Sequence, residues 1–509
     1  MHYANVIIIG AGAAGLTASI FAARGLQQDR GMLQNRDTHT GGRGGRAISK
    51  DSDTTGVILL ERTPQPGRKI LMSGGTRCNV LPVEMRLDDF VTDSSRNRMR
   101  NIFRSWSVDA CRRWFTDEIG LRLACEEASN KWFPESNSAR EVRDRLVRKA
   151  VDLGVDIRTG ASVASVRRSG EMWIVSTGDG VHFGAPVVVF ATGGLSIPST
   201  GTDGTGHSIA ETLGHSLHPT YPALTPLKGP HPGSEPLPGV SLDVDLEPVF
   251  VDMAASGSNV SDPATDVTHA NIRLVPKERC PFRTRRSGFL FTHHGCSGPA
   301  VLDVSHVIVR AQGIKSSEQG ALQNRSANSP DHAPYNPSNP AGDRQPFTGE
   351  HPTAALRINW TGKPSAWWQE QLEGRHTTTS LLRSHLPRRL ADNLLRENGL
   401  ADRKTAQLSA KERQRLVSDL TAYLLIPTGH LGYKKAEVTG GGVPLDENDP
   451  ATMESRVAPG IFLCGEILDV FGRIGGFNFY WAWVSGRLAG IHAASAARES
   501  AAGTSDMEI

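Results

Sequence analysis

Three glycines near the N-terminus have the spacing of a phosphate-binding turn. Gly10, Gly12 and Gly15 lie in "VIIIGAGAAGLTASIFAARG", between an apolar run and a segment typical of a helix. In such a turn the first glycine lets the chain reverse, the second lets a pyrophosphate approach the backbone, and the third packs helix against strand. Amides at the helix start, here Ala13 and Ala14, then face the phosphates. The motif alone also fits a purely structural turn, so its context must decide.

That context includes an acid at the end of a second apolar run. "VILLE" ends in Glu61, where a carboxylate can accept hydrogen bonds from an adenosine ribose, and Arg62 follows it. The interval from Gly15 to Glu61 is 46 residues, against about 20 in the usual pattern. Residues 27–56 are polar and Gly-rich, which predicts a mobile loop, and removing them restores the interval. The context favours a dinucleotide site over a structural turn.

A basic, Gly-rich loop follows directly. "GRKILMSGGTRCN" (67–79) offers cationic side chains and bare backbone amides that can surround phosphates, although a solvated basic turn has the same composition. The residues assigned to the predicted cofactor site are Arg68, Lys69, Ser73, Gly74, Gly75, Arg77 and Asn79.

This loop resembles the GRK-[IL]-x-x-SGGGRCN signature of the YhiN/BaiN-like flavoproteins, a family that includes aminoacetone-oxidase-like enzymes. The resemblance implies a non-covalently bound FAD lying along the loop. Thr76 stands where the family usually has a third glycine, so the backbone at that position needs separate examination.

Three more blocks resemble the same family in the same order, so the resemblance spans nearly the whole chain. They are residues 187–215, 289–305 and the C-terminal segments 436–443 and 452–490. The resemblance places Thr192 and Gly193 at a strand end beside the nucleotide, and Gly465 and Glu466 at the ribityl chain. It also implies that the backbone of Val163 meets the adenine, whereas the sequence alone describes Val163 as an ordinary strand residue.

The most aromatic stretch of the chain is "GGFNFYWAWVSGRLAG" (475–490). Phe477, Trp481, Val484 and Leu488 recur at helical spacing, which predicts a core helix. Ser485, Arg487 and His492 interrupt the apolar run, so a membrane span is disfavoured. We expect Gly475, Gly476, Phe477 and Asn478 to bring bare backbone and a helix N-terminus to the pyrimidine edge of the flavin.

Catalytic side chains are harder to assign. Gly476, Asn478 and His293 are the candidates that we select, with His294, Tyr433 and Lys434 as further acid or base groups. A histidine in a strand or turn is more often a hydrogen-bonded structural residue. Cys78 and Cys296 read as small packed residues. No C-x-x-C pair suggests a dithiol, no His/Cys spacing suggests a metal, and no second G-x-G-x-x-G suggests a nicotinamide domain.

The composition bounds the class of protein. The 509 residues carry 56 Lys and Arg against 53 Asp and Glu, so no nucleic-acid or membrane partner is expected and a small-molecule substrate is favoured. The basic "GGRGGR" (41–46) reads as part of a solvated loop. Scattered cysteines suit a reducing cytoplasm, and the N-terminus lacks the basic region of a signal peptide.

The patterns predict an α/β fold in which a Rossmann-like FAD-binding domain is interrupted by an inserted antiparallel β-barrel-like module and a small helical module. The predicted parts are 1–214 (FAD-binding, with the insertion 27–56), 215–362 (β module with a mobile loop 311–352), 363–428 (helical module) and 429–509 (FAD-binding, C-terminal part). The oligomeric state is left open.

These inferences predict an FAD-dependent oxidoreductase that uses NADH or NADPH, bound transiently, to reduce a small or medium-sized conjugated carbonyl compound through flavin N5. Two alternatives stay open: an oxygen-dependent amine oxidase resembling aminoacetone oxidase, and a flavin-bound interaction protein that touches RNA through "GGRGGR".

Overall fold

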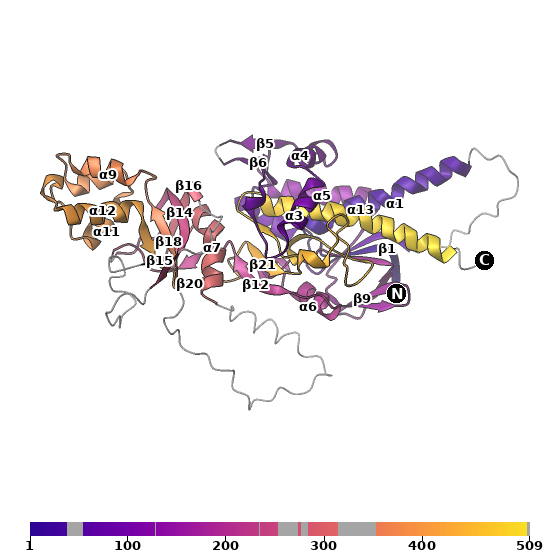
Figure 1. The fold of residues 1–509 in the computed structure, drawn as a ribbon. Helices are drawn as coiled ribbons and strands as arrows, with labels where there is room; N and C mark the ends of the chain where they lie inside the picture. The colour runs from indigo at the N-terminus through magenta and orange to yellow at the C-terminus, as the bar shows by residue number, and fades with distance from the viewer. Residues whose placement is uncertain are drawn as a thin grey trace, which may run out of the picture. The chain divides into compact units, whose positions relative to one another are not determined.

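The computed structural model describes residues 1–37, 54–127, 129–233, 235–252, 273–275, 284–313 and 353–505. The chain divides into two compact units (Figure 1). Unit 1 contains Met1–Thr220 and Val438–Ile509, and unit 2 contains Tyr221–Glu437. Unit 1 is therefore built from two separate stretches of chain. The predicted β module and helical module both fall largely in unit 2.

A mixed sheet forms the centre of unit 1. Strand β1 (His2–Ile9) lies in the middle, and the positions Val6 to Ile9 are buried because helices cover the sheet. Parallel strands follow in the order β22-β11-β1-β2-β7, and an antiparallel meander β10-β9-β8 continues from β1. The remaining strands are β2 (Thr54–Glu61), β7 (Asp156–Thr159), β8 (Val163–Ser169), β9 (Met172–Thr177), β10 (His182–Ala185), β11 (Val187–Phe190) and β22 (Ile461–Leu463).

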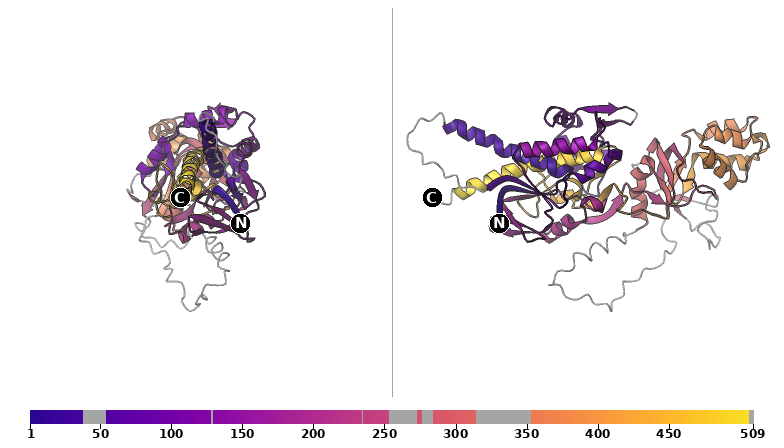
Figure 2. Two further views of the ribbon diagram at one scale, coloured as in Figure 1. Left: turned by 90° about the vertical axis from the view of Figure 1, so that its right-hand side faces the viewer. Right: turned by 180° about the vertical axis from the view of Figure 1, so that it is seen from behind.

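Two long helices from opposite ends of the chain pack along one another (Figures 1 and 2). They are α1 (Ala13–Asp37) and α13 (Phe477–Ser505). A β-carbon on Gly486 would lie 2.5 Å from the carbonyl oxygen of Ala14, and one on Gly490 would collide with the carbonyl oxygen of Ala18. The two glycines therefore allow the two helices to approach closely.

The aromatic stripe on α13 is core packing. Tyr480, Trp481 and Trp483 are each at most 2% exposed, and they pack with Phe103 and Phe115 of helices α3 (Arg96–Arg104) and α4 (Val108–Asp117). The other helices of unit 1 are α2 (Arg68–Met72), α5 (Ala139–Asp152) and α6 (Thr205–Thr212). None of the helices in the described ranges is both long and apolar enough to cross a membrane.

Two small sheets of unit 1 lie beside the main sheet. One joins β3 (Leu81–Pro82), β6 (Lys131–Pro134) and β5 (Leu123–Glu126), and the other joins β4 (Phe90–Val91) to β23 (Phe471–Gly472). Both small sheets lie next to the sequence blocks assigned to the cofactor, so they support those loops.

Unit 2 contains an antiparallel sheet in the order β19-β18-β14-β16-β17-β13-β20, with β15 beside β14. The prediction of an antiparallel module within 215–362 agrees with β13 to β18, whereas β19 and β20 come from segments predicted as helical module and FAD-binding domain. The predicted barrel is not found: in the described part of the chain the end strands β19 and β20 do not pair, so the sheet is open. The strands are β13 (Leu227–Lys228), β14 (Ser241–Asp252), β15 (Arg273–Val275), β16 (Thr284–Thr292), β17 (Gly295–Ser297), β18 (Thr353–Asn359), β19 (Tyr423–Leu425) and β20 (Gly429–His430).

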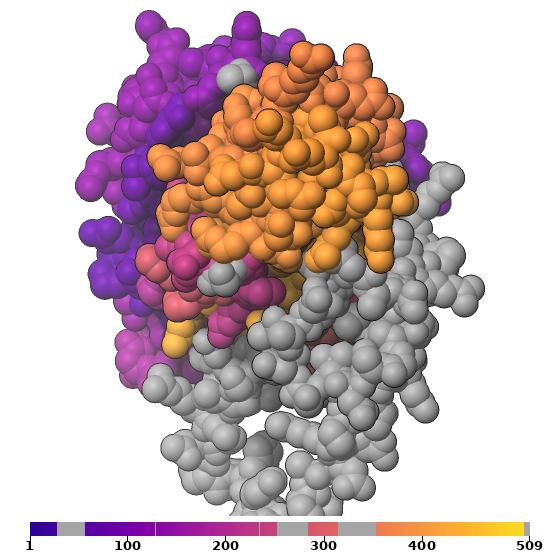
Figure 3. Space-filling model, turned by 90° about the vertical axis from the view of Figure 1, so that its left-hand side faces the viewer, coloured from indigo at the N-terminus to yellow at the C-terminus, as the bar shows by residue number. Residues whose placement is uncertain are grey.

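Helices cover this sheet. Helix α7 (Pro299–Ala311) packs on β14, β16 and β18. The predicted helical segment forms a cluster, orange in Figure 3, of α9 (Ser365–Leu372), α10 (Thr378–Arg383), α11 (Arg388–Glu397) and α12 (Ala410–Thr421). Helix α12 opens with the capping box of Ser409 and Glu412, in which each residue bonds the other's backbone amide.

The loop predicted for residues 27–56 needs correction at both of its ends. Helix α1 continues to Asp37, and β2 begins at Thr54. Gln, Arg, Met and Leu are good helix formers, so their helix propensity outweighs the polar composition that suggested a loop. "GGRGGR" (41–46) and positions 314–352 of the second predicted loop lie outside the described residues.

Candidate cofactor-binding site

The Gly-rich turn between β1 and α1 uses its three glycines differently. Gly10 has a φ of 99°, and a β-carbon there would lie 2.5 Å from the carbonyl oxygen of Ala191. A β-carbon on Gly15 would collide with the carbonyl oxygen of Gly10, whereas one on Gly12 would meet no atom within 4 Å. The first and third glycines thus serve packing, and the second opens onto free space at the N-terminus of α1, where a phosphate group fits.

Glu61 holds this turn to the end of β2. Its carboxylate, buried with its residue at 8% exposure, accepts a hydrogen bond from the amide of Ala11 at 2.9 Å. The other oxygen accepts from the amide and hydroxyl of Thr63 at 2.8 and 2.7 Å. A carboxylate has about four acceptor sites, so capacity remains for a ribose hydroxyl. The carbonyl of Glu61 also accepts the amide of Ala161, which places Val163 at the start of β8 close to this end of the site.

Arg62 directly follows Glu61 at the end of β2. Its guanidinium pairs with Asp203 at 2.5 Å and donates to the carbonyl of Gly201 at 3.3 Å. Burial by itself would raise the pKa of Asp203, but the hydrogen bonds from Arg62 and Thr205 outweigh it and hold the pKa below its usual value. Arg62 therefore fastens the block 187–215 to the end of β2.

The basic loop adopts a run of left-handed backbone. Gly74 and Gly75 have φ of 55° and 64°, and Thr76 follows with 72°. Thr76 therefore takes the conformation that suits the family's usual glycine, and as a β-branched residue it is strained there. Asn79 packs its side-chain oxygen 2.8 Å from where a β-carbon on Gly74 would stand, while Gly75 faces open space. Ser73 donates to the carbonyl of Ile70 at 2.7 Å, and Arg68 is exposed.

Lys69 and Glu466 form the most connected polar group of the site. The ammonium of Lys69 lies 2.5 Å from one oxygen of Glu466 and donates to the hydroxyl of Ser196 at 2.6 Å. Ser196 in turn donates to the other oxygen at 2.7 Å, and the amide of Thr439 does so at 2.9 Å. Burial alone would raise the pKa of Glu466, but Lys69 and these donors hold the pKa below its usual range.

Arg77 makes contacts within the protein. It pairs with Glu126 at 2.8 Å, donates to Asn137 at 2.8 Å, and its guanidinium lies 4.0 Å above the ring of Phe133. These contacts fasten the β5–β6 hairpin to the Gly-rich loop, and contact of Arg77 with the cofactor stays a prediction.

The strand end after β11 carries Thr192 and Gly193. Gly193 has a φ of 72°. The hydroxyl oxygen of Thr192 is buried and, among the described residues, has no hydrogen-bond partner. A buried hydroxyl without a partner is costly. Its oxygen lies against Gly206, where a β-carbon would stand 1.9 Å away, so contact of Thr192 with the cofactor stays a prediction.

The C-terminal block (452–490) also contributes residues to this site. Gly465 is fixed by α13, since its amide donates to Ser485 and its carbonyl accepts the indole N–H of Trp481, both at 3.0 Å. Gly475 and Gly476 precede Phe477, the first residue of α13. A β-carbon on Gly476 would lie 2.7 Å from the carbonyl carbon of Leu81. The start of α13 therefore packs directly against β3, the strand that follows the basic loop.

The catalytic candidates are divided between the two units. The amide group of Asn478 exchanges two hydrogen bonds with the backbone of Gly472, at 2.8 and 2.9 Å, so in this structure it holds a turn. His293 and His294 are exposed in the turn between β16 and β17, which belongs to unit 2, as do Tyr433 and Lys434. Their catalytic role stays a prediction. No cluster of metal-ligating side chains is found in the described ranges.

The sequence is also that of a known family. The family model for the HI0933-like protein Rossmann domain matches residues 40–492. The chain belongs to the HI0933-like family. As a member it is an FAD-dependent oxidoreductase, which confirms the cofactor and the enzyme class predicted from the motifs.

Two relatives match this chain over almost their full length. One is a ribosomal RNA dihydrouridine synthase of Escherichia coli, 29% identical over 95% of this chain and 96% of that protein. Another is a 3-dehydro-bile acid delta(4,6)-reductase of Clostridium scindens, 28% identical over 96% of this chain and 98% of that protein. Among solved structures, Escherichia coli quinol fumarate reductase FrdA matches with a TM-score of 0.42 at 15% identity, covering 99% of this chain and 74% of that one.

The residues of unit 1 fit an FAD. The chain offers free space at Gly12, spare acceptor capacity on Glu61 and an ionised, buried Glu466. Each is a feature that an uncharged, well-packed core would lack. Sequence reasoning missed Asp203, Ser196 and Thr439, whose partners lie far away along the chain. The only feature of the sequence that points to these three residues is their position in the blocks that resemble the family.

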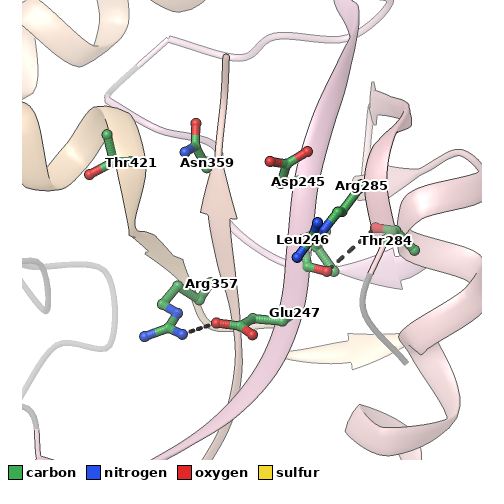
Figure 4. A pocket seen from close by; sticks show the side chains of 8 residues that line it. All are labelled: Asp245, Leu246, Glu247, Thr284, Arg285, Arg357, Asn359 and Thr421. Atoms are coloured by element: carbon green, nitrogen blue, oxygen red, sulfur yellow. Dashed lines mark hydrogen bonds and ion pairs between the residues drawn. The ribbon is translucent and has the colours of Figure 1, made fainter. Parts of the chain in front are cut away.

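Unit 2 contains a separate polar hollow of about 180 Å³ (Figure 4). Several of its polar groups bond within the unit: Glu247 pairs with Arg357, and Asp245 accepts the amide of Arg286 at 2.8 Å. Asn359 accepts the amide of Gly362 at 2.8 Å. Arg285 also lines the hollow, and no described contact assigns a ligand to it.

Proposed function

We propose that this HI0933-like flavoprotein reduces a carbon–carbon double bond conjugated to a carbonyl, with NADH or NADPH as the reductant. The observation that carries the proposal is the chemistry shared by the two relatives' names. Dihydrouridine is uridine whose ring double bond, conjugated to a carbonyl, has been reduced. A delta(4,6)-reductase of a 3-dehydro bile acid likewise acts on double bonds conjugated to a 3-oxo group.

The residues of unit 1 support such a reaction by binding and orientation. The turn at Gly12 takes the pyrophosphate, Glu61 accepts a ribose hydroxyl, and Glu466 accepts a hydroxyl of the ribityl chain. FAD, when bound, supplies the hydride transfer. The amides at the start of α13, preceded by Gly475 and Gly476, direct the positive end of a 29-residue helix toward the site. A positive helix end favours the negative charge that reduction creates.

The substrate's size separates two candidates. The nearly balanced charge of the chain, 56 basic against 53 acidic residues, supports a small or medium-sized conjugated carbonyl compound. The second candidate is uridine within ribosomal RNA, supported by the relative that is 29% identical over 95% of this chain.

The test is anaerobic mixing of the purified flavoprotein with NADH or NADPH while the absorbance of oxidised flavin is followed. We expect one of the two to bleach the flavin. A 3-oxo-Δ4,6 steroid or ribosomal RNA lacking dihydrouridine is then added, and the one that restores the yellow colour is the substrate. Failure of both nucleotides to bleach the flavin, together with peroxide production from amines in air, would replace the proposal with an amine oxidase.

A further inference from the structure

One lysine stands at the start of α13 without an assigned role. Lys131 opens strand β6 and is paired in register with Pro82 of β3. Its Cε lies 3.0 Å, and its Cδ 3.7 Å, from the point where a β-carbon on Gly475 would stand. The side chain of Lys131 therefore occupies the space that the missing side chain of Gly475 leaves free.

Lys131 faces one carboxylate across the hairpin, that of Glu126, its register partner on β5. No carboxylate within the described ranges lies at ion-pair distance from its ammonium group, although the residue is half-buried. The neighbouring cation, Arg77, is already committed to Glu126 and Asn137. The pKa of Glu126 is lowered first by its hydrogen bond with Ser129, then by Arg77, and Lys131 contributes only through space. A half-buried cation without an ion pair, whose cross-strand acid is already bonded to Arg77 and Ser129, has charge available for a ligand.

The backbone beside Lys131 adds to the same positive field. Gly475 and Gly476 have φ of 125° and 92°, and the first turn of α13 carries no acidic side chain. The packing of Gly476 on Leu81 brings the exit of the basic loop to the same point. Helix amides, an unpaired lysine and the loop expected along the FAD thus converge.

We propose that Lys131 is the side-chain cation at the pyrimidine edge of the flavin, where it stabilises the negative charge that two-electron reduction leaves on N1 and O2. This inference rests on the proposed FAD site. Lys131 moves no proton and forms no bond: the two electrons arrive with the hydride that the nicotinamide gives to N5, and the lysine lowers the energy of the resulting anion. It thereby raises the flavin's reduction potential.

The test uses sulfite, which adds to N5 of oxidised flavin and leaves the same negative charge on the N1/O2 edge, so that neither NAD(P)H nor a substrate is needed. In the FAD-loaded full chain, Lys131→Met and Lys131→Gln should weaken sulfite binding about tenfold, equivalent to about 30 mV for a two-electron couple. Lys131→Arg keeps the charge and should stay within about twofold of wild type. Arg122→Met removes an exposed cation just before the same hairpin and is the matched control.

The outcomes separate this inference from the proposed reaction. Wild-type sulfite affinity in both neutral variants, an equal loss in Arg122→Met, or an equal loss in Lys131→Arg would overturn it. Neutral variants that fold but retain no FAD would also overturn it, because Lys131 would then be needed for binding. A wild-type protein that fails to oxidise NAD(P)H would remove the proposed function while leaving the sulfite comparison intact.

Discussion

At the scale of single residues, Lys69 and Glu466 show how the fold keeps a buried carboxylate ionised. Glu466 accepts hydrogen bonds from Lys69, Ser196 and the amide of Thr439. The loss of one partner leaves the other charge partly buried and uncompensated, which costs more than the pair contributes. This asymmetry makes the pair testable.

We expect Lys69→Met to lower the free energy of unfolding by about 2 kcal/mol, less than the roughly 3–5 kcal/mol of a fully buried pair, because the two side chains keep 27% and 17% exposure. The double variant Lys69→Met, Glu466→Gln should recover part of that loss, since no unpaired charge remains. Urea unfolding of the four proteins of the cycle measures both effects. Strictly additive losses would show that the two side chains do not interact.

Asp419 of α12 gives a prediction about pH. Burial, with the nearby carboxylate of Glu397, raises its pKa from 3.8 to about 6, although Asn398 donates to it at 2.7 Å and Arg415 opposes the shift. Between those two pH values the unfolded chain is ionised while the folded chain keeps the proton, so the stability from this group is complete below pH 3.8 and is lost as the pH rises through about 6.

We therefore expect Asp419→Asn, which can still accept from Asn398, to stabilise the protein at pH 7 by up to about 3 kcal/mol. The advantage over wild type should vanish near pH 4. Thermal melting of both proteins across this range tests the sign, and Asp402→Asn, at an exposed position, is the control. A difference in melting temperature that does not vary with pH would contradict the assignment.

At the scale of elements, the pairing of α1 with α13 depends on small residues. Glycine to alanine in a helix interior normally stabilises by about 1 kcal/mol. Gly490→Ala should instead destabilise, by about 1–3 kcal/mol, because its methyl group would collide with the carbonyl oxygen of Ala18. Gly178→Ala, where the nearest atom is 3.9 Å away, should be neutral. Denaturant midpoints compare the two, and a stabilised Gly490→Ala would mean that the helices do not touch there.

Elements defined by local spacing can be predicted from the sequence, whereas contacts between distant residues cannot. The Gly10 turn and the stripe on α13 follow from local spacing, so they are found without a structure. Lys69 and Glu466 were each identified, but their ion pair joins residues 397 positions apart and no local pattern encodes it. The contacts of Arg77 with Glu126 and Asn137 likewise join residues far apart in the chain, and no local pattern encodes them. Whether the unit 2 sheet closes depends on which strands pair at its two ends. The alternation of apolar and polar residues along a strand does not specify its partner.

At the scale of the whole molecule, unit 1 is made from the two ends of the chain, and unit 2 is inserted between them. The insertion leaves and returns through β12 (His218–Ala223) and β21 (Val438–Gly442), which are neighbours in a two-stranded sheet. Within unit 1, Gly441 packs on the carbonyl oxygen of Pro219. The chain therefore leaves unit 1 and re-enters it at neighbouring positions. Every predicted cofactor-binding residue lies in unit 1.

We expect a protein in which residues 224–437 are replaced by a short glycine–asparagine linker to fold and to bind FAD, because the linker only closes a hairpin between the adjacent strands β12 and β21. It should lose reduction of the conjugated substrate, since it lacks the unit that contains His293. Flavin absorbance after gel filtration measures the binding. Gly12→Val in the same shortened protein is the control: the position has no neighbouring atom within 4 Å, so the side chain should spare the fold while filling the space for the pyrophosphate. A shortened protein that melts cooperatively yet retains no flavin would show that unit 2 contributes to the FAD site.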